Sequence, residues 1–235
     1  FPGCSNLILY KLNDKYVFVG GQLFLMGASF LFNLVAAKLI GPQQMGEWQT
    51  ISLISIYGMI LTFGIIDGMG RDVPYYRGKG DETEINSTIA TTILYLLAMG
   101  TVFLVGISLV SGMLPGANKM IIVLGTVLLC ARMVNSFSTI LVRSFRDFRL
   151  LGLHQGITAL AMLLTIIPLY LYPELYTVYC GVFLSLVVVI LLSRKYCNLR
   201  PWSKVSLQRL LRTGFPIYIV GLVFILLTSV DRVVV

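Results

Sequence analysis

The residues best suited to chemistry in this 235-residue sequence are a few charged side chains inside long apolar runs. Arg132 lies about midway along the run 120–142 and is followed by several small polar residues. A charge inside a membrane span is costly, so its side chain is expected to face a wet cavity or a partner. Arg132 therefore predicts a site for an anionic head group such as a phosphate, which suits a guanidinium fork, or a structural pair with a carboxylate.

Other charges near or inside the apolar runs carry weaker signals. Lys38 lies two residues from the end of the first run, where its chain can extend to the interface. Asp67 either binds a coupling cation or pairs with Arg71 at i+4, and we favour the salt bridge. Asp231 and Arg232 are adjacent, so they point about 100° apart on a helix and at least one should face away from lipid.

The sequence speaks against catalysis. It contains no Ser/His/Asp set, no H-E-x-x-H motif, no nucleotide-binding loop and no cluster with metal-ligand spacing. The four cysteines are scattered. We therefore expect neither an enzyme nor a cofactor or metal site.

The elements that carry these charges are membrane spans. Hydrophobic residues make up 57% of the chain and charged residues 12%, against about 25% charged in soluble proteins. Mean hydropathy is +0.88. Runs long enough to cross a bilayer as helices predict an all-α polytopic membrane protein with six spans and the start of a seventh. They are 17–40, 51–70, 88–110, 120–142, 153–172, 177–192 and 215 onward.

The basic residues predict the orientation of these spans. Fourteen Lys and Arg residues fall on one side of the predicted membrane and one, Lys119, on the other. The positive-inside rule then places the N-terminus and the long loops in the cytoplasm, at the cytoplasmic membrane. The net charge of +8 is thereby explained by topology, so no nucleic-acid partner is expected.

Helix-breaking residues and glycine pairs predict the organisation of the chain. Gly41-Pro42 should end the first helix, so that 41–50 forms a turn and the chain enters a hairpin. The pairs Gly64/Gly68 and Gly152/Gly156 should allow close helix packing. We expect a cytoplasmic arm, a six-helix bundle, an amphipathic linker and the first helix of a second bundle, in a fragment of a longer protein cut inside a helix. The four parts are 1–16, 17–192, 193–214 and 215–235.

Three segments resemble polysaccharide-export flippases of the multidrug/oligosaccharidyl-lipid/polysaccharide exporter superfamily. Residues 37–48 (A-K-L-I-G-P-Q-Q-M-G-E-W) are similar to the end of that family's first span and its G-P-x-x-x-G turn. Residues 63–71 (F-G-I-I-D-G-M-G-R), followed by P-Y-Y at 74–76, are similar to its exit from the second span. G-F-P at 214–216, with Asp231 and Arg232, is similar to the opening of its second bundle.

The resemblance implies a protein of about 12 to 14 helices in two bundles around a central cavity. It would move an isoprenoid-diphosphate-linked oligosaccharide to the outer leaflet by alternating access. The family's cationic cavity is carried over to Arg132, Lys38 and Arg232. The implied partners are this lipid-linked oligosaccharide, membrane lipids and envelope-polysaccharide assembly proteins.

Two alternatives stay open. A drug or cation antiporter of the same superfamily would use Asp67 or Asp231 to bind Na⁺ or H⁺ in an acidic cavity. A non-transporting scaffold for envelope-polymer assembly would need no charge at mid-membrane. The complete spans hold Lys38 and Arg132 against Asp67, which favours an anionic cargo.

Overall fold

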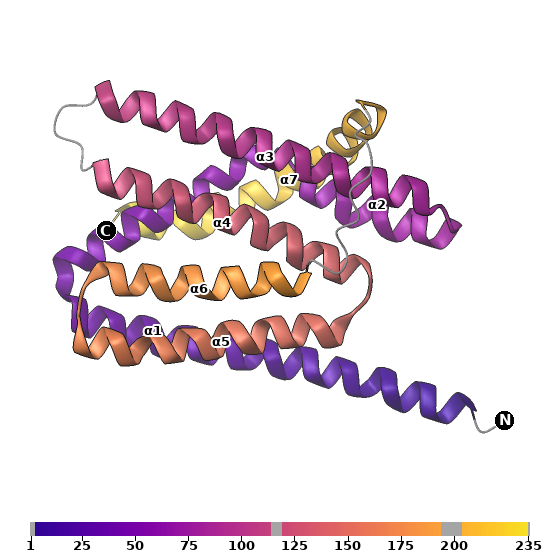
Figure 1. Ribbon diagram of the computed structural model, residues 1–235, viewed down its shortest axis with the longest axis horizontal. Coiled ribbons are helices and arrows are strands. Elements are labelled where there is room, and N and C mark those ends of the chain that lie inside the picture. Colours follow the sequence, from indigo (N-terminus) through magenta and orange to yellow (C-terminus); the bar gives the residue numbers. More distant parts are fainter. Residues whose placement is uncertain (1–2, 114–118, 194–203, 235) are drawn as a thin grey trace. The chain divides into compact units, whose positions relative to one another are not determined.

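The computed structural model describes the backbone of residues 3–113, 119–193 and 204–234, which is helical apart from short connections (Figure 1). No strand occurs in these ranges, and the predicted all-α class is confirmed. In chain order the elements are α1 Gly3–Gly58, η1 Met59–Thr62, α2 Ile65–Lys79, α3 Glu82–Met113, α4 Lys119–Ser144, α5 Phe148–Leu171, α6 Leu175–Ser193 and α7 Lys204–Val234.

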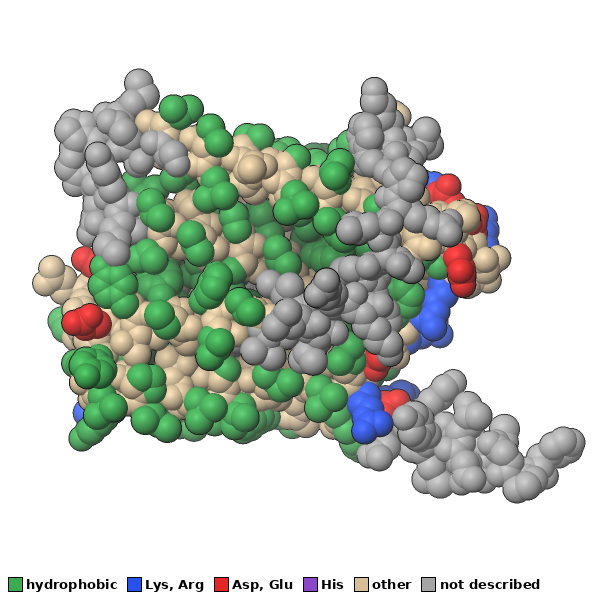
Figure 2. All heavy atoms as spheres, viewed as in Figure 1, with side chains coloured by type: hydrophobic (Ala, Val, Ile, Leu, Met, Phe, Trp, Pro, Cys, Tyr) green, Lys and Arg blue, Asp and Glu red, His purple; other side chains and the backbone are tan. Residues whose placement is uncertain are grey.

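Four of the described helices are long and apolar enough to cross a bilayer. They are Asp14–Thr62, Glu82–Ile107, Ile122–Ser144 and Phe148–Leu171, and Leu175–Leu184 forms a shorter apolar helix. Figure 2 shows hydrophobic side chains covering the long helices, and many large ones, such as Leu97 at 63% exposure, face outward. An apolar surface on hydrogen-bonded helices suits lipid contact, because a bilayer offers backbone groups no other partners.

The chain divides into two compact units. Unit 1 comprises Phe1–Gly46 and Arg146–Arg194, and unit 2 comprises Glu47–Phe145 and Lys195–Val235. Unit 1 therefore holds most of α1 with α5 and α6, whereas unit 2 holds η1, α2, α3, α4 and α7. The division into a bundle over 17–192 and a linker over 193–214 stays a prediction.

The helix break expected at Gly41 is confirmed, but the turn expected over 41–50 is wrong. Gly41 has φ 80° and ψ 169°, and it is the non-helical residue inside α1. The helix resumes immediately after it, with Pro42 in its first turn. Proline suits that position because its missing N–H would have no partner there in any case.

The second predicted span, 51–70, is interrupted instead of continuous. The 3₁₀ turn η1 ends at Phe63 (φ 44°), Gly64 follows at φ 76°, and α2 begins at Ile65. Within the break, Thr62 Oγ1 donates to the Met59 carbonyl at 2.9 Å and the Phe63 amide donates to Ile60 at 3.1 Å. These bonds lower the cost of breaking a helix at membrane depth.

Helices α2 and α7 of unit 2 meet backbone to backbone. A Cβ added to Gly64 would lie 2.6 Å from the Gly214 carbonyl oxygen, and one on Gly68 would overlap the Leu210 carbonyl oxygen. The predicted close packing at Gly64 and Gly68 is thereby confirmed. This contact joins a buried apolar core made of Ile65, Ile66, Met69, Val73, Ile85, Ile89, Leu96, Phe137, Leu141 and Leu210.

In unit 1, α1 packs against α5 in a similar way. A Cβ on Gly21 would lie 2.6 Å from the Gly152 carbonyl oxygen, so Gly152 confirms the predicted close packing. Gly156 does not, because nothing lies within 4 Å of its Cβ position. One turn along, Gln155 Nε2 donates to Gln22 Oε1. A side-chain hydrogen bond and a small-residue contact thus hold the two helices together.

Helix α3 begins with a polar cap outside the apolar part of the chain. Asp81 accepts hydrogen bonds from the Thr83 hydroxyl at 2.6 Å and from the Glu84 amide at 3.2 Å. These bonds, the one from Thr83 foremost, hold the pKa of the Asp81 carboxyl below its usual value. The cap satisfies a free amide of the first helical turn.

We expect Gly214→Ala to destabilise unit 2. The new methyl group would overlap the Gly64 carbonyl oxygen, and overpacking of this kind costs about 1–3 kcal/mol. Thermal unfolding of the purified protein measures the loss. Gly221→Ala in the same helix is the matched control, because nothing lies within 4 Å of its Cβ position. Equal melting temperatures for the two variants would contradict the tight contact.

Candidate functional site

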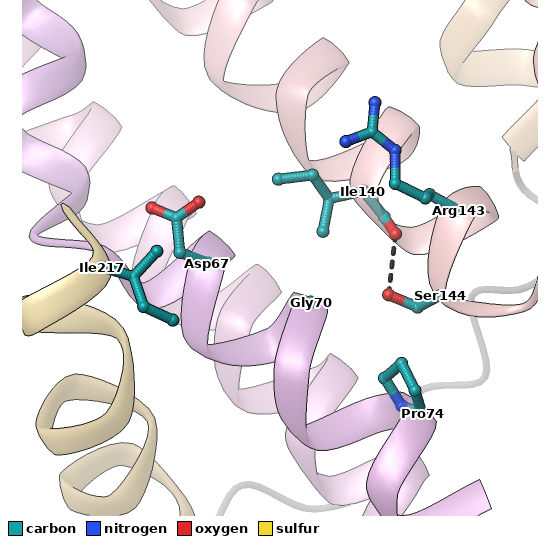
Figure 3. Close-up of a pocket in the computed structure, with 7 residues that line it drawn as sticks. All are labelled: Asp67, Gly70, Pro74, Ile140, Arg143, Ser144 and Ile217. Carbon is teal, nitrogen blue, oxygen red and sulfur yellow. Dashed lines mark hydrogen bonds between the residues drawn. The ribbon is translucent and has the colours of Figure 1, made fainter. Parts of the chain in front are cut away.

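A cavity of about 290 Å³ lies between three helices of unit 2. Figure 3 shows the side chains that surround it. Its lining residues are Asp67, Gly70 and Pro74 from α2, Ile140, Arg143 and Ser144 from α4, and Ile217 from α7. The cavity brings together one acid, one base and several apolar side chains, a combination common in small-molecule sites.

The cavity lies where the apolar part of unit 2 gives way to its charged part. The apolar span of α4 ends at Ser144, which is one of the lining residues. Helix α2 carries charges from Asp67 to its last turn, and Figure 2 shows charged side chains gathered at that end. This is the basic side that the sequence analysis predicts to be cytoplasmic.

Asp67 reaches the cavity from the first turn of α2. The predicted salt bridge with Arg71 is wrong, because Asp67 has neither an ion pair nor a hydrogen bond among the described residues. Arg71 is exposed, where an ion pair gains little against hydration and side-chain entropy. In Figure 3 the Asp67 carboxylate lies near Ile217 of α7, which is also a lining residue of the cavity.

Arg143 supplies the positive charge of the cavity, and the sequence analysis missed this role. It lies in the last turn of α4, is exposed, and has no ion pair or hydrogen bond within the described ranges. Its neighbour Ser144 donates to the Ile140 carbonyl at 2.8 Å. No sequence signal separates Arg143 from Arg146 and Arg149, because all three follow the same apolar run.

The other predicted site residues lie elsewhere. Arg132 is half-buried in α4 and interacts with other groups, eleven residues before Arg143 and thus about 16 Å along the helix. Lys38 is exposed on α1 in unit 1. Asp231 and Arg232 belong to α7, but their side chains lie outside the described residues. The substrate and ion roles of these residues stay predictions.

A second polar cluster ties two walls of the cavity in place. Arg209 of α7 binds Asp72 of α2 at 3.2 Å through Nε and Glu84 of α3 at 2.8 Å through Nη2. Its guanidinium also lies 4.7 Å from the centre of the Tyr76 ring. The sequence alone does not distinguish Arg209 from the other basic residues between the spans, because its partners Asp72 and Glu84 are more than 100 residues away along the chain. The cluster fixes the start of α7 against α2 and α3.

A double-mutant cycle on Arg209→Gln should give the larger coupling energy with Asp72→Asn. The Asp72 side chain is 10% exposed and that of Glu84 is 38% exposed, so water screens the second pair more strongly. We expect a coupling of about 1–3 kcal/mol with Asp72 and below about 1 kcal/mol with Glu84→Gln. Denaturant or thermal unfolding of the four variants in each cycle measures both. A larger coupling with Glu84 would mean that the shorter distance outweighs burial.

Solved structures with a similar fold are transporters. The chain is similar to a MOP superfamily transporter from Pyrococcus furiosus, whose binding pocket has a reverse polarity that suggests a different function. The likeness has a TM-score of 0.63 at 17% identity and covers 86% of this chain and 52% of that one. An outward-facing multidrug resistance MATE family transporter of the MOP superfamily gives 0.62 at 18% identity, with the same coverage.

A third structure, of MATE in complex with Br-NRF, gives a TM-score of 0.58 at 15% identity, over 86% of this chain and 53% of that one. No protein-family model and no curated protein matches the sequence. The chain spans about half the length of the transporters it resembles. The chain therefore shares the fold of about half of each of these proteins.

Proposed function

We propose that this chain is part of a MOP superfamily transporter that moves an isoprenoid-diphosphate-linked oligosaccharide across the cytoplasmic membrane by alternating access. The observation that carries the proposal is the shared fold over 86% of the chain. Three sequence segments that resemble polysaccharide-export flippases supply the finer assignment. Envelope-polysaccharide assembly proteins are the natural partners of such a step.

The chemistry of the cargo agrees with the charges of the chain. A diphosphate-linked sugar has a large, polar and anionic head group, so it needs a wet path lined by cations, whereas its lipid tail can stay in the bilayer. Arg132 is half-buried on α4, one of the four described helices able to span the membrane. A guanidinium binds phosphate oxygens through two parallel hydrogen bonds, which gives both affinity and orientation. Arg132 is therefore our first candidate for a cargo contact, with Lys38 and Arg232 as further candidates.

A drug or cation antiporter is the second candidate function. The observation that favours it is Asp67, a cavity-lining carboxylate that forms no ion pair with any residue the structure describes. A half-buried carboxylate at the end of the apolar segments suits binding of a proton or Na⁺. In this alternative Asp67 and Asp231 couple ion flow to drug export, and Arg132 is a structural residue.

Replacing Arg132 tests the cargo assignment. In the intact protein, Arg132→Ala should reduce export of the surface polysaccharide. Arg132→Lys should retain part of the export, because lysine keeps the positive charge but lacks the two parallel N–H donors of the guanidinium. Loss of a hydrogen bond to a charged group costs about 1.5–3 kcal/mol, so the export rate should fall roughly 10- to 100-fold. Arg71→Ala is the matched control, since it removes an equal charge from an exposed position in the same unit.

The measurement combines polysaccharide export, the amount of protein in the membrane and the level of undelivered lipid-linked sugar. Loss of export with normal abundance and accumulated lipid-linked sugar supports the flippase. Full export with Arg132→Ala overturns the role of this residue. A variant or deletion that changes drug tolerance and leaves the polysaccharide untouched would favour the antiporter.

A further inference from the structure

The cavity between α2, α4 and α7 holds an acid and a base that do not pair with each other. Asp67 and Arg143 both line it, yet within the described ranges neither forms an ion pair or a hydrogen bond. In the view of Figure 3 the Ile140 side chain lies between them. A Cβ on Gly70 would lie 2.9 Å from Ile140 Cγ2, so this isoleucine is wedged against α2 and keeps the two charges apart.

Simple ions fit this arrangement poorly. A lone cation at Asp67 would share the cavity with the guanidinium of Arg143, and a lone anion at Arg143 would share it with a carboxylate. At 4–8 Å, like charges at the protein surface repel by about 2–4 kcal/mol. A ligand that carries both charges avoids both repulsions, because its cation lies next to Asp67 and its anion lies next to Arg143.

We propose that this cavity binds a zwitterionic head group made of a primary ammonium and a phosphate, as in phosphoethanolamine. The ammonium donates hydrogen bonds to the Asp67 carboxylate, the one acidic side chain among the seven lining residues. The phosphate accepts hydrogen bonds from the guanidinium of Arg143. The Ser144 proton is already donated to the Ile140 carbonyl, so the phosphate depends on Arg143 for its donors.

The position and size of the cavity favour a lipid as the source of this group. The site lies where the apolar span of α4 ends, which is the depth of phospholipid head groups. Its volume of about 290 Å³ suits a small head group, and Ile217, 45% exposed, offers apolar surface to the first carbons of an acyl chain. None of the seven lining residues is aromatic, so the site lacks the ring faces that bind a quaternary ammonium such as choline.

The inference does not depend on the cargo, because binding of a head group is measured without transport. The intact protein is delipidated in detergent and given one compound at a time: phosphatidylethanolamine, phosphatidylcholine, phosphatidylglycerol or soluble phosphoethanolamine. Native mass spectrometry and thermal unfolding report binding. We expect phosphatidylethanolamine to bind about tenfold more tightly than the other two lipids. Binding of soluble phosphoethanolamine would show that the head group suffices, and its absence with lipid binding would show that the acyl chains contribute.

Two variants test the assignment of each charge. Asp67→Asn should weaken phosphatidylethanolamine about tenfold and strengthen phosphatidylglycerol, because it removes the carboxylate that repels an anionic lipid. Arg143→Gln should weaken both lipids. Arg146→Gln is the matched control, since this exposed arginine follows α4 but does not line the cavity.

Several outcomes would overturn the proposal. One is equal binding of the three lipids by the wild-type protein. This comparison uses no variant, so it holds even if the variants misfold. Another is stabilisation of the wild type by Na⁺ alone that Asp67→Asn abolishes, which would make the cavity a cation site. A third is an Asp67→Asn variant with unchanged lipid preference. A variant that loses polysaccharide export but keeps its lipid binding would bear on the proposed transport function and would leave the lipid site intact.

Discussion

The backbone contact between α2 and α7 at Gly64 and Gly214 sets the geometry of unit 2. Neither position has room for a Cβ, so the two helices approach at a distance that only glycine allows. The contact fixes the register of α7. One turn before Gly214, Leu210 is fully buried in the core, and one turn after it Ile217 lines the same cavity as Asp67. With the same register, Arg209 reaches both Asp72 and Glu84.

The glycine contact also explains why α2 begins where it does. Gly64 adopts a left-handed conformation at φ 76°, which ends one helical segment and starts the next. Asp67 then falls in the first turn of α2, and Arg143 falls in the last turn of α4. Each charge therefore has the sign that its helix dipole favours, worth about 0.3–1 kcal/mol. Arg143 is exposed and Asp67 is half-buried, so water also solvates both charges.

Sequence patterns predicted what depends on local chemistry. The apolar runs gave the helical membrane class, Gly41-Pro42 gave a real helix break, and the glycine spacing gave two close helix contacts. The break at Phe63 and Gly64 was missed because apolar residues surround it and the residue packed against Gly64, Gly214, is 150 residues along the chain.

The polar part of the site was harder to predict than the spans. The salt bridge between Asp67 and Arg71 was predicted from their i, i+4 spacing, which takes account of one helix alone. In the structure Asp67 instead lines a cavity together with residues of α4 and α7. Arg143 and Arg209 had looked like two of fourteen equivalent basic residues. Their roles arise from partners on other helices, and a single sequence does not encode such distances in any short pattern.

Helix α4 carries an arginine at each of two levels, Arg132 and Arg143. Arg132 and Arg143 are eleven residues apart on one helix, about 16 Å along its axis, so Arg132 lies within the span when Arg143 lies at its end. At the head-group level water screens charge over about 8 Å, and little of the field of Arg143 reaches Arg132. Direct electrostatic coupling between the two positions is therefore weak. Substitutions at Arg132 and at Arg143 are therefore expected to have independent effects.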